Sequence, residues 1–191
     1  MKLFEITKKI INLTGTKVYD SQTTVANSNL TVSTGVGGEN LSLQGNGSVI
    51  SAAKSNGKTI SLGTLQLNST GSGSAGNYTL LGGTHTFDIT ARPLTFTSSR
   101  NYDGVTSVDT SGLTYSFSNL VSGESLVLSG SGTVASKDVS AGTQNVTLGT
   151  IALADNTGVA SNYSLTSGTM DINLASDPLG QDENGNNVFL K

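Results

Sequence analysis

Apolar and polar residues alternate in short runs along most of the chain. Because successive side chains of a β-strand point to opposite faces, this period of two indicates strands buried on one side. Turn signals such as Gly45-Asn46-Gly47 and Gly82-Gly83 separate the runs, and no stretch of about 10 or more residues carries a helical stripe. The pattern predicts an all-β protein with about seven to nine short strands in each half. The clearest alternating positions are Ile11/Leu13, Leu41/Leu43, Phe87/Ile89, Leu94/Phe96, Tyr115/Phe117, Leu126/Leu128 and Met170/Ile172.

The chain contains two copies of one sequence unit. Short blocks recur in the same order, and the spacing between copies is 83 positions at Tyr19 and Tyr102 and 85 positions at Glu39 and Glu124. We therefore predict two small β-sandwich (Ig-like) domains in tandem, arranged end to end. No Gly-, Ser- or Pro-rich linker separates them, so we expect a junction that restricts bending. The predicted boundaries are 6–88 for the first domain, 89–174 for the second, and 175–191 for a polar linker or C-terminal tail with a short strand at Val188-Phe189-Leu190.

Composition narrows the class of protein. Charged residues make up only 12% of the chain and hydrophobic residues 35%, whereas disordered chains combine low hydrophobicity with high charge. The net charge of −3 argues against a partner that is nucleic acid or an anionic membrane surface. No apolar run reaches the roughly 18 residues that span a bilayer, and the absence of cysteine suits an exported bacterial protein. We expect a monomer whose export signal lies outside this sequence.

The most distinctive motif is a Tyr-Asp turn, present as Tyr19-Asp20 and as Tyr102-Asp103-Gly104. Asp-Gly tolerates positive φ, and the aspartate can accept hydrogen bonds from nearby backbone amides. A tyrosine at such a corner buries its ring while its hydroxyl reaches the backbone. We interpret the motif as structural, with Ser21 causing some strain where the second copy has glycine.

Other recurring polar residues admit two interpretations. Glu39/Glu124 and Asp88/Asp171 recur with the blocks Asn77-Tyr78 and Asn162-Tyr163, which favours a shared structural role in both copies. Calcium is the alternative for the carboxylates, and the segment 182–187 resembles a calcium loop in composition only. We otherwise expect no cofactor. His85 is the only histidine and cysteine is absent, so we expect neither a zinc site nor an enzyme.

These motifs resemble the YDG domain family, the tandem repeats of large bacterial surface proteins related to filamentous-haemagglutinin-type, two-partner-secreted adhesins. Pro93 to Thr97, Tyr102-Asp103-Gly104, Gly123-Glu124 and Ser161 to Leu165 carry the resemblance, which extends to about Asn173. The first copy departs from the family pattern at Ser21 and at Ala53-Lys54-Ser55.

The resemblance implies a secreted stalk or spacer on a Gram-negative cell surface, whose partners are the neighbouring repeats. A different class of function is a binding module for a glycan or a host or biofilm ligand. Tyr115 and Phe117 are the best candidates for such a module, because glycan sites use exposed aromatic platforms. Two exposed, coplanar rings favour binding, whereas rings that face the core favour a spacer.

Overall fold

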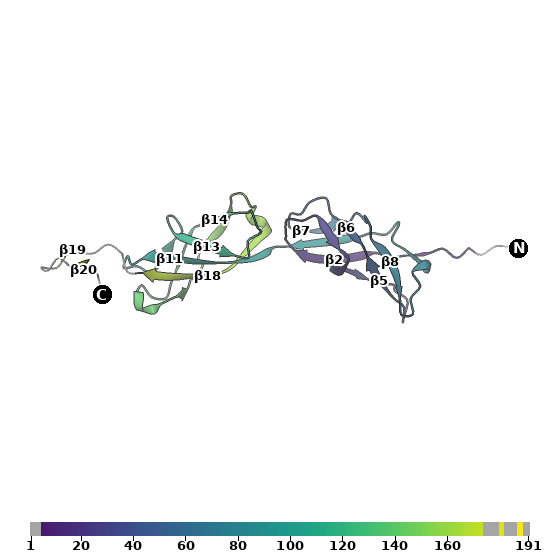
Figure 1. Ribbon diagram of the computed structural model, residues 1–191, viewed down its shortest axis with the longest axis horizontal. Helices are drawn as coiled ribbons and strands as arrows, with labels where there is room; N and C mark the ends of the chain where they lie inside the picture. The colour runs from purple at the N-terminus through teal and green to yellow at the C-terminus, as the bar shows by residue number, and fades with distance from the viewer. Residues whose placement is uncertain (1–4, 174–179, 182–186, 189–191) are drawn as a thin grey trace. The chain divides into compact units, whose positions relative to one another are not determined.

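The computed structural model describes residues 5–173, 180–181 and 187–188, and it divides into two compact units, one ending at Ala91 and one beginning at Arg92 (Figure 1). Over the described residues every regular element is a strand or a three-residue 3-10 turn, which confirms the predicted all-β class. No helix in these ranges is long and apolar enough to cross a membrane. That each unit is an Ig-like β-sandwich stays a prediction.

The first unit is built on a four-stranded sheet with the strand order β4-β2-β10-β7. Three two-stranded sheets accompany it, with the pairings β1-β9, β3-β6 and β5-β8. Its elements are β1 (Lys9–Ile10), β2 (Leu13–Val18), β3 (Thr24–Ala26), η1 (Asn27–Asn29), β4 (Leu30–Val32), β5 (Asn40–Gln44), β6 (Asn46–Ser48), β7 (Ser55–Thr59), β8 (Gln66–Thr70), η2 (Ala75–Asn77), β9 (Tyr78–Thr79) and β10 (Thr86–Thr90).

The second unit repeats this plan with the order β13-β11-β18-β16 and the pairs β12-β15 and β14-β17. Its elements are β11 (Arg92–Asn101), β12 (Ser107–Asp109), β13 (Thr114–Ser118), β14 (Leu126–Ser129), β15 (Ser131–Thr133), η3 (Val139–Ala141), β16 (Gln144–Asn145), β17 (Ala152–Asp155), η4 (Ala160–Asn162) and β18 (Tyr163–Asn173). In the predicted tail, β19 (Gly180–Gln181) pairs antiparallel with β20 (Asn187–Val188); Phe189 and Leu190 of the expected strand lie outside the described residues.

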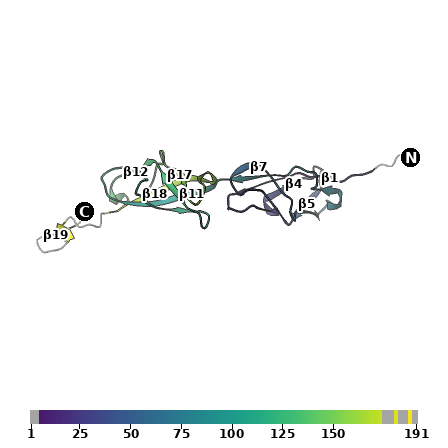
Figure 2. The same ribbon diagram turned by 90° about the horizontal axis from the view of Figure 1, so that it is seen from above.

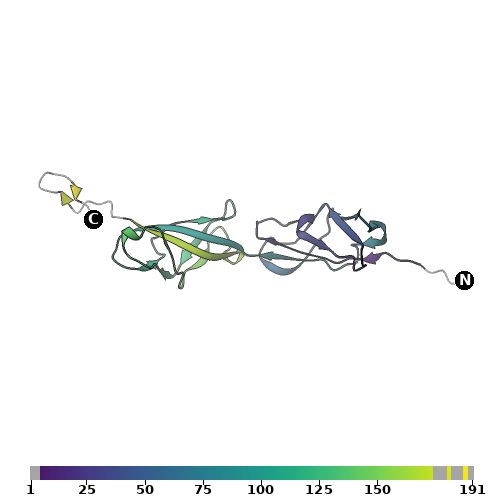
Figure 3. The ribbon, with the colours of Figure 1, turned by 90° about the horizontal axis from the view of Figure 1, so that it is seen from below.

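The first and last strands of each unit are parallel neighbours. In the first unit β2 pairs with β10, and β1 pairs with β9. In the second unit β11 and β18 run side by side over almost their full lengths, as Figures 1 and 2 label them and Figure 3 shows in teal and yellow-green. We call this pairing of first and last strands the terminal ladder. The chain therefore enters and leaves each unit at opposite ends of one ladder.

Each unit has its own apolar core, supplied by the alternating positions of the sequence pattern. Leu13, Phe87 and Ile89 are fully buried in the first unit, and Leu94 and Met170 in the second. Alternation succeeds because one face of each terminal ladder packs inward while the other carries Thr, Ser and Asp. The second core consists of Phe96, Val108, Leu128, Val134, Val146, Ile151, Met170 and Ile172.

The terminal ladder of the first unit is interrupted, and His85 fills the break. The N–H of Leu13 donates to Nδ1 of His85 over 3.1 Å, so the other ring nitrogen, Nε2, carries the proton and donates to the Leu80 carbonyl over 2.9 Å. The imidazole is buried and links the N–H of Leu13 to the carbonyl of Leu80 where the two strands do not bond directly. This places His85 in the core of the first unit.

Candidate functional site

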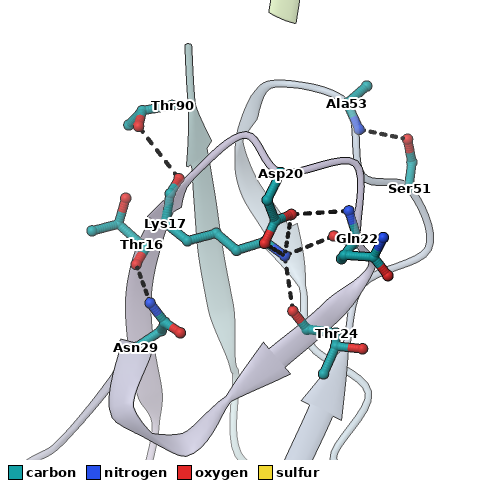
Figure 4. A network of polar contacts seen from close by, with 9 residues as sticks. All are labelled: Thr16, Lys17, Asp20, Gln22, Thr24, Asn29, Ser51, Ala53 and Thr90. Atoms are coloured by element: carbon teal, nitrogen blue, oxygen red, sulfur yellow. Dashed lines mark hydrogen bonds and ion pairs between the residues drawn. The ribbon is translucent and has the colours of Figure 1, made fainter. Parts of the chain in front are cut away.

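The Tyr-Asp turn of the first unit closes around a lysine. Nζ of Lys17 lies 2.9 Å from Oδ1 and 3.1 Å from Oδ2 of Asp20, and it donates to the carbonyls of Gln22 at 2.7 Å and Thr24 at 2.9 Å (Figure 4). Oδ1 of Asp20 also accepts the N–H of Gln22 over 2.9 Å. Only 7% of the Lys17 side chain is exposed, so this ammonium sits among protein oxygens rather than in water. We call this arrangement the cation clasp.

The second unit builds the same clasp with arginine. Arg100 lies 3.1 Å from Oδ2 of Asp103 and donates to the carbonyls of Val105 and Ser107. Oδ1 of Asp103 accepts the N–H of Val105 over 3.2 Å. All of these positions match the first unit at a spacing of 83 residues. The two cations were not predicted from the sequence, although a basic residue three positions before the aspartate in each copy is a signal that identifies them.

Backbone conformation in the turn follows the sequence expectation. Ser21 has a φ of 62° and Gly104 a φ of 80°, both in the left-handed region that glycine adopts most easily. Ser21 therefore carries strain that Gly104 does not. The turn also ends the terminal ladder, because the N–H of Tyr19 donates to Thr90 over 3.0 Å and that of Tyr102 to Asn173 over 2.8 Å.

The two tyrosines of the turn differ, and the predicted burial is wrong for Tyr102. Tyr19 is buried, whereas 38% of Tyr102 is exposed. Instead of entering the core, the Tyr102 ring makes a cation–π contact at the surface with Lys137, whose Nζ lies 5.7 Å from the ring centre. A hydrogen bond to Asp138 raises the pKa of Lys137, and its contact with Tyr102 acts in the same direction.

A second repeated contact joins the other predicted residues in pairs. Tyr163 donates from its hydroxyl to Oε2 of Glu124 over 2.6 Å, and Tyr78 donates to Oε2 of Glu39 in the same way. Both tyrosines are buried. The hydrogen bond to Glu39 is the main reason why the pKa of Tyr78 is raised, with burial and the glutamate charge adding to it and Thr34 opposing it. Each pair ties a loop to the strand that follows the 3-10 turn.

The two asparagines of the recurring blocks end those 3-10 turns. The backbone N–H of Asn77 donates to Ser74, and that of Asn162 donates to Val159, each over 3.0 Å. Asn162 is buried, whereas Asn77 is exposed. Each asparagine precedes the buried tyrosine directly, so it positions the start of β9 or β18.

Tyr115 and Phe117 do not form an aromatic platform. Their ring centres lie 5.5 Å apart with the planes at 70°, and both side chains pack against the second core. The Tyr115 hydroxyl accepts the N–H of Leu128 over 3.0 Å. The rings are neither coplanar nor fully exposed, so the condition that favours glycan binding at this position is not met.

No cluster of three or more His, Asp or Glu side chains that could hold a metal ion occurs among the residues described. Asp88 and Asp171 occupy the last strand of each terminal ladder, and Oδ1 of Asp88 accepts the N–H of Gly57 over 2.7 Å. Residues 182–186 of the calcium-loop-like segment 182–187 lie outside the described residues. The expected absence of a cofactor, and calcium as its alternative, both stay predictions.

Comparison with protein-family models gives one match that covers most of the chain. Residues 5–86 and residues 89–170 each match the YDG domain. Comparison with curated proteins and with solved structures gives no match.

Proposed function

The chain belongs to the YDG domain family, because it contains two YDG domains in tandem, and from this membership we propose that it is a non-catalytic spacer segment of a secreted bacterial adhesin. In this role it lies outside a Gram-negative cell. It holds an adhesive region away from the surface and so supports attachment or biofilm formation. Its partners are the neighbouring repeats of the same polypeptide.

One observation carries the proposal: in both copies the recurring polar side chains form hydrogen bonds and ion pairs within their own unit. The carboxylates of Asp20 and Asp103 hold a cation and an amide of their own turn. Glu39 and Glu124 each accept a tyrosine hydroxyl of their own unit. A binding or catalytic group needs free atoms that face a ligand, whereas bonds repeated within each copy serve to define the fold.

The same reasoning argues against catalysis. A general base needs an accessible nitrogen or oxygen within hydrogen-bond reach of its substrate. His85 is buried, and both of its ring nitrogens are engaged with Leu13 and Leu80. We therefore propose that His85 has a structural role.

The test varies two things separately: the number of copies of the chain and the presence of a binding domain at its outer end. The full 191-residue chain is placed between an outer-membrane anchor and a nanobody, either once, twice in series, or not at all. A spacer raises the height of the nanobody above the membrane with each added chain, measured by super-resolution microscopy. Adhesion to antigen-coated beads should require the nanobody in every case.

Two outcomes contradict the proposal. Height that does not change with the number of chains would exclude a spacer. Saturable binding of the chain without the nanobody, to a glycan array or to extracted biofilm matrix, would instead support a binding module. A Tyr115→Ala variant would then show whether the partly buried aromatic pair takes part.

A further inference from the structure

We infer that each unit withstands mechanical tension and that its terminal ladder resists this tension in shear. Tension in a chain enters a unit at its first strand and leaves at its last strand. Because these two strands are parallel, the points of entry and exit lie at opposite ends of the ladder. Pulling then slides the strands along each other and loads all of their hydrogen bonds together. In an antiparallel pair connected at one end, the bonds instead open one after another.

The second unit has the longer ladder. Ten residue pairs join β11 to β18, from Arg92 opposite Tyr163 to Asn101 opposite Asn173, with one register shift between Leu94 and Thr95. The bond from Tyr102 to Asn173 extends the ladder at its far end.

Side chains reinforce this ladder from both faces. The hydroxyl of Thr166 donates to the Leu94 carbonyl over 2.9 Å, and that of Ser98 donates to the Thr169 carbonyl over 2.8 Å. On the inner face Leu94, Phe96, Met170 and Ile172 are buried. This apolar layer shields that side of the ladder from water, which would otherwise compete for its hydrogen bonds.

The ladder of the first unit is shorter and split. Five residue pairs join β2 to β10, and only two join β1 to β9. Between the two parts the connection consists of the bond from Ile11 to Thr79, the bond from the N–H of Thr84 to Oδ1 of Asn12, and the imidazole of His85. A split ladder shares the load among fewer bonds at a time, so the first unit yields at a lower force than the second.

This inference deepens the proposed spacer role and rests on it only for the source of tension in the cell. Mechanical resistance is measured on the purified chain, so it can fail while the surface role stands. The spacer role can likewise fail while the mechanical resistance stands. The two proposals therefore have separate tests.

The absence of cysteine allows the direction of pulling to be chosen exactly in one unit. Pairing Pro93→Cys with Asn173→Cys attaches handles at opposite ends of the second ladder and loads it in shear. Pairing Asn101→Cys with Asn173→Cys attaches them to ladder partners at one end and opens the ladder pair by pair. All three positions are exposed, so the handles do not enter the core.

Single-molecule force spectroscopy of the full chain should give an unfolding force several times higher in shear than in the opening geometry. The contour lengths between handles, about 290 Å and about 260 Å, identify the unfolding unit as the second one. Equal forces in the two geometries would overturn the inference. Thermal unfolding of both cysteine pairs checks that each variant starts from the same folded state.

Pulling the unmodified chain by its two termini tests the order of yielding. Two events are expected, and His85→Ala should lower only the weaker one. A change in the stronger event, or no change in the weaker, contradicts the assigned order. If His85→Ala prevents the first unit from folding, the geometry test in the second unit still decides whether the ladder resists shear.

Discussion

At the scale of single residues, Tyr78 and Tyr163 do the same work although their surroundings differ. Each donates to a glutamate 39 positions earlier and is buried at the start of the strand that follows a 3-10 turn. In the second unit the tyrosine oxygen also accepts the N–H of Val121 over 3.3 Å. In the first unit Thr34 acts on Tyr78 instead, and its hydroxyl donates to the Glu39 carbonyl over 3.0 Å. A single hydroxyl thus fixes a loop in both copies.

Tyr78 makes the first unit sensitive to alkaline pH. Its pKa is raised in the folded protein, chiefly by the hydrogen bond to Glu39, so folding favours the protonated hydroxyl. The corresponding stability is complete below the ordinary tyrosine pKa of about 10 and is lost as the pH rises through the folded-state value. Tyr78→Phe should therefore be less stable than the parent chain at neutral pH, and the gap should narrow above a pH of about 10. Urea midpoints measured over this range by circular dichroism test the prediction.

The control is Tyr102→Phe, which removes a hydroxyl from an exposed ring. This variant should follow the alkaline loss of the parent chain and so account for general effects of tyrosine ionisation. A gap between Tyr78→Phe and the parent that is constant across the pH range would show that Tyr78 does not cause the loss.

At the scale of elements, each terminal ladder pairs a large side chain on one strand with a small residue on the facing strand, and the strand that carries the large side chain can differ between the two units. In the first unit Gly15 lies opposite Phe87, and just before this pair the N–H of Leu13 bonds to the imidazole of His85. At the positions equivalent to Leu13 and His85, the second unit has Phe96 and Gly168, which are ladder partners. A large side chain on one strand thus lies across a small residue on the other in both units, which keeps the inner face filled.

The Phe96 and Gly168 pair leads to a prediction. A Cβ on Gly168 would lie 2.1 Å from Cε1 and Cζ of Phe96, a distance that no relaxed packing allows. Both residues are buried, so the ring has little room to move. Gly168→Ala should cost about 1–3 kcal/mol in the free energy of unfolding, as expected for overpacking. Calorimetry or urea unfolding of the full chain measures the loss in the second unit.

A double variant separates a clash from a general effect of replacing glycine. Phe96→Leu introduces the smaller residue that the first unit has at this position, so it should restore part of the stability of Gly168→Ala. Gly37→Ala is the matched control, because a Cβ there would meet no atom within 4 Å. Additive losses in the double variant would exclude the ring as the cause.

The same elements show how far the sequence determines the structure. Period-two alternation was sufficient to predict the all-β class, and the repeated blocks predicted the tandem units. Neither could predict that the first and last strands are parallel, because register depends on contacts between residues such as Arg92 and Tyr163 that lie far apart in sequence. Lys17 was overlooked for a related reason. A lysine within an alternating strand has the pattern of a surface residue, and its burial arises only when the turn folds back over it.

Exposure of Tyr102 was equally beyond the sequence pattern. Tyr19 and Tyr102 occupy equivalent positions, and the motif alone predicts the same burial for both. In the folded second unit the Tyr102 ring contacts Lys137, which lies 35 positions later in the sequence, and the motif alone does not reveal this neighbour. Repeats of one motif can therefore keep the backbone of a turn and change its surface.

At the scale of the whole molecule, the two units have the same architecture but use different side chains for it. Each has a terminal ladder, a clasp at the end of that ladder and a core of its own. The cation is Lys17 in one clasp and Arg100 in the other, which indicates that the turn requires a positive charge with several donors rather than one residue type.

Replacing one cation should therefore affect one unit. Lys17→Met removes the ammonium and leaves the carboxylate of Asp20 and the carbonyls of Gln22 and Thr24 without their charged partner. The expected loss is about 1–3 kcal/mol in the free energy of unfolding, the usual range when hydrogen bonds to a charged group are removed. Hydrogen exchange should accelerate in peptides from β2 and β10 and remain unchanged in peptides from β11 and β18.

Lys17→Arg is the control and should retain protection, because arginine forms the clasp in the second unit. Equal loss of protection in both units after Lys17→Met would show that the clasp does not act within a single unit, and equal losses for Met and Arg at this position would show that the positive charge is not what holds the turn.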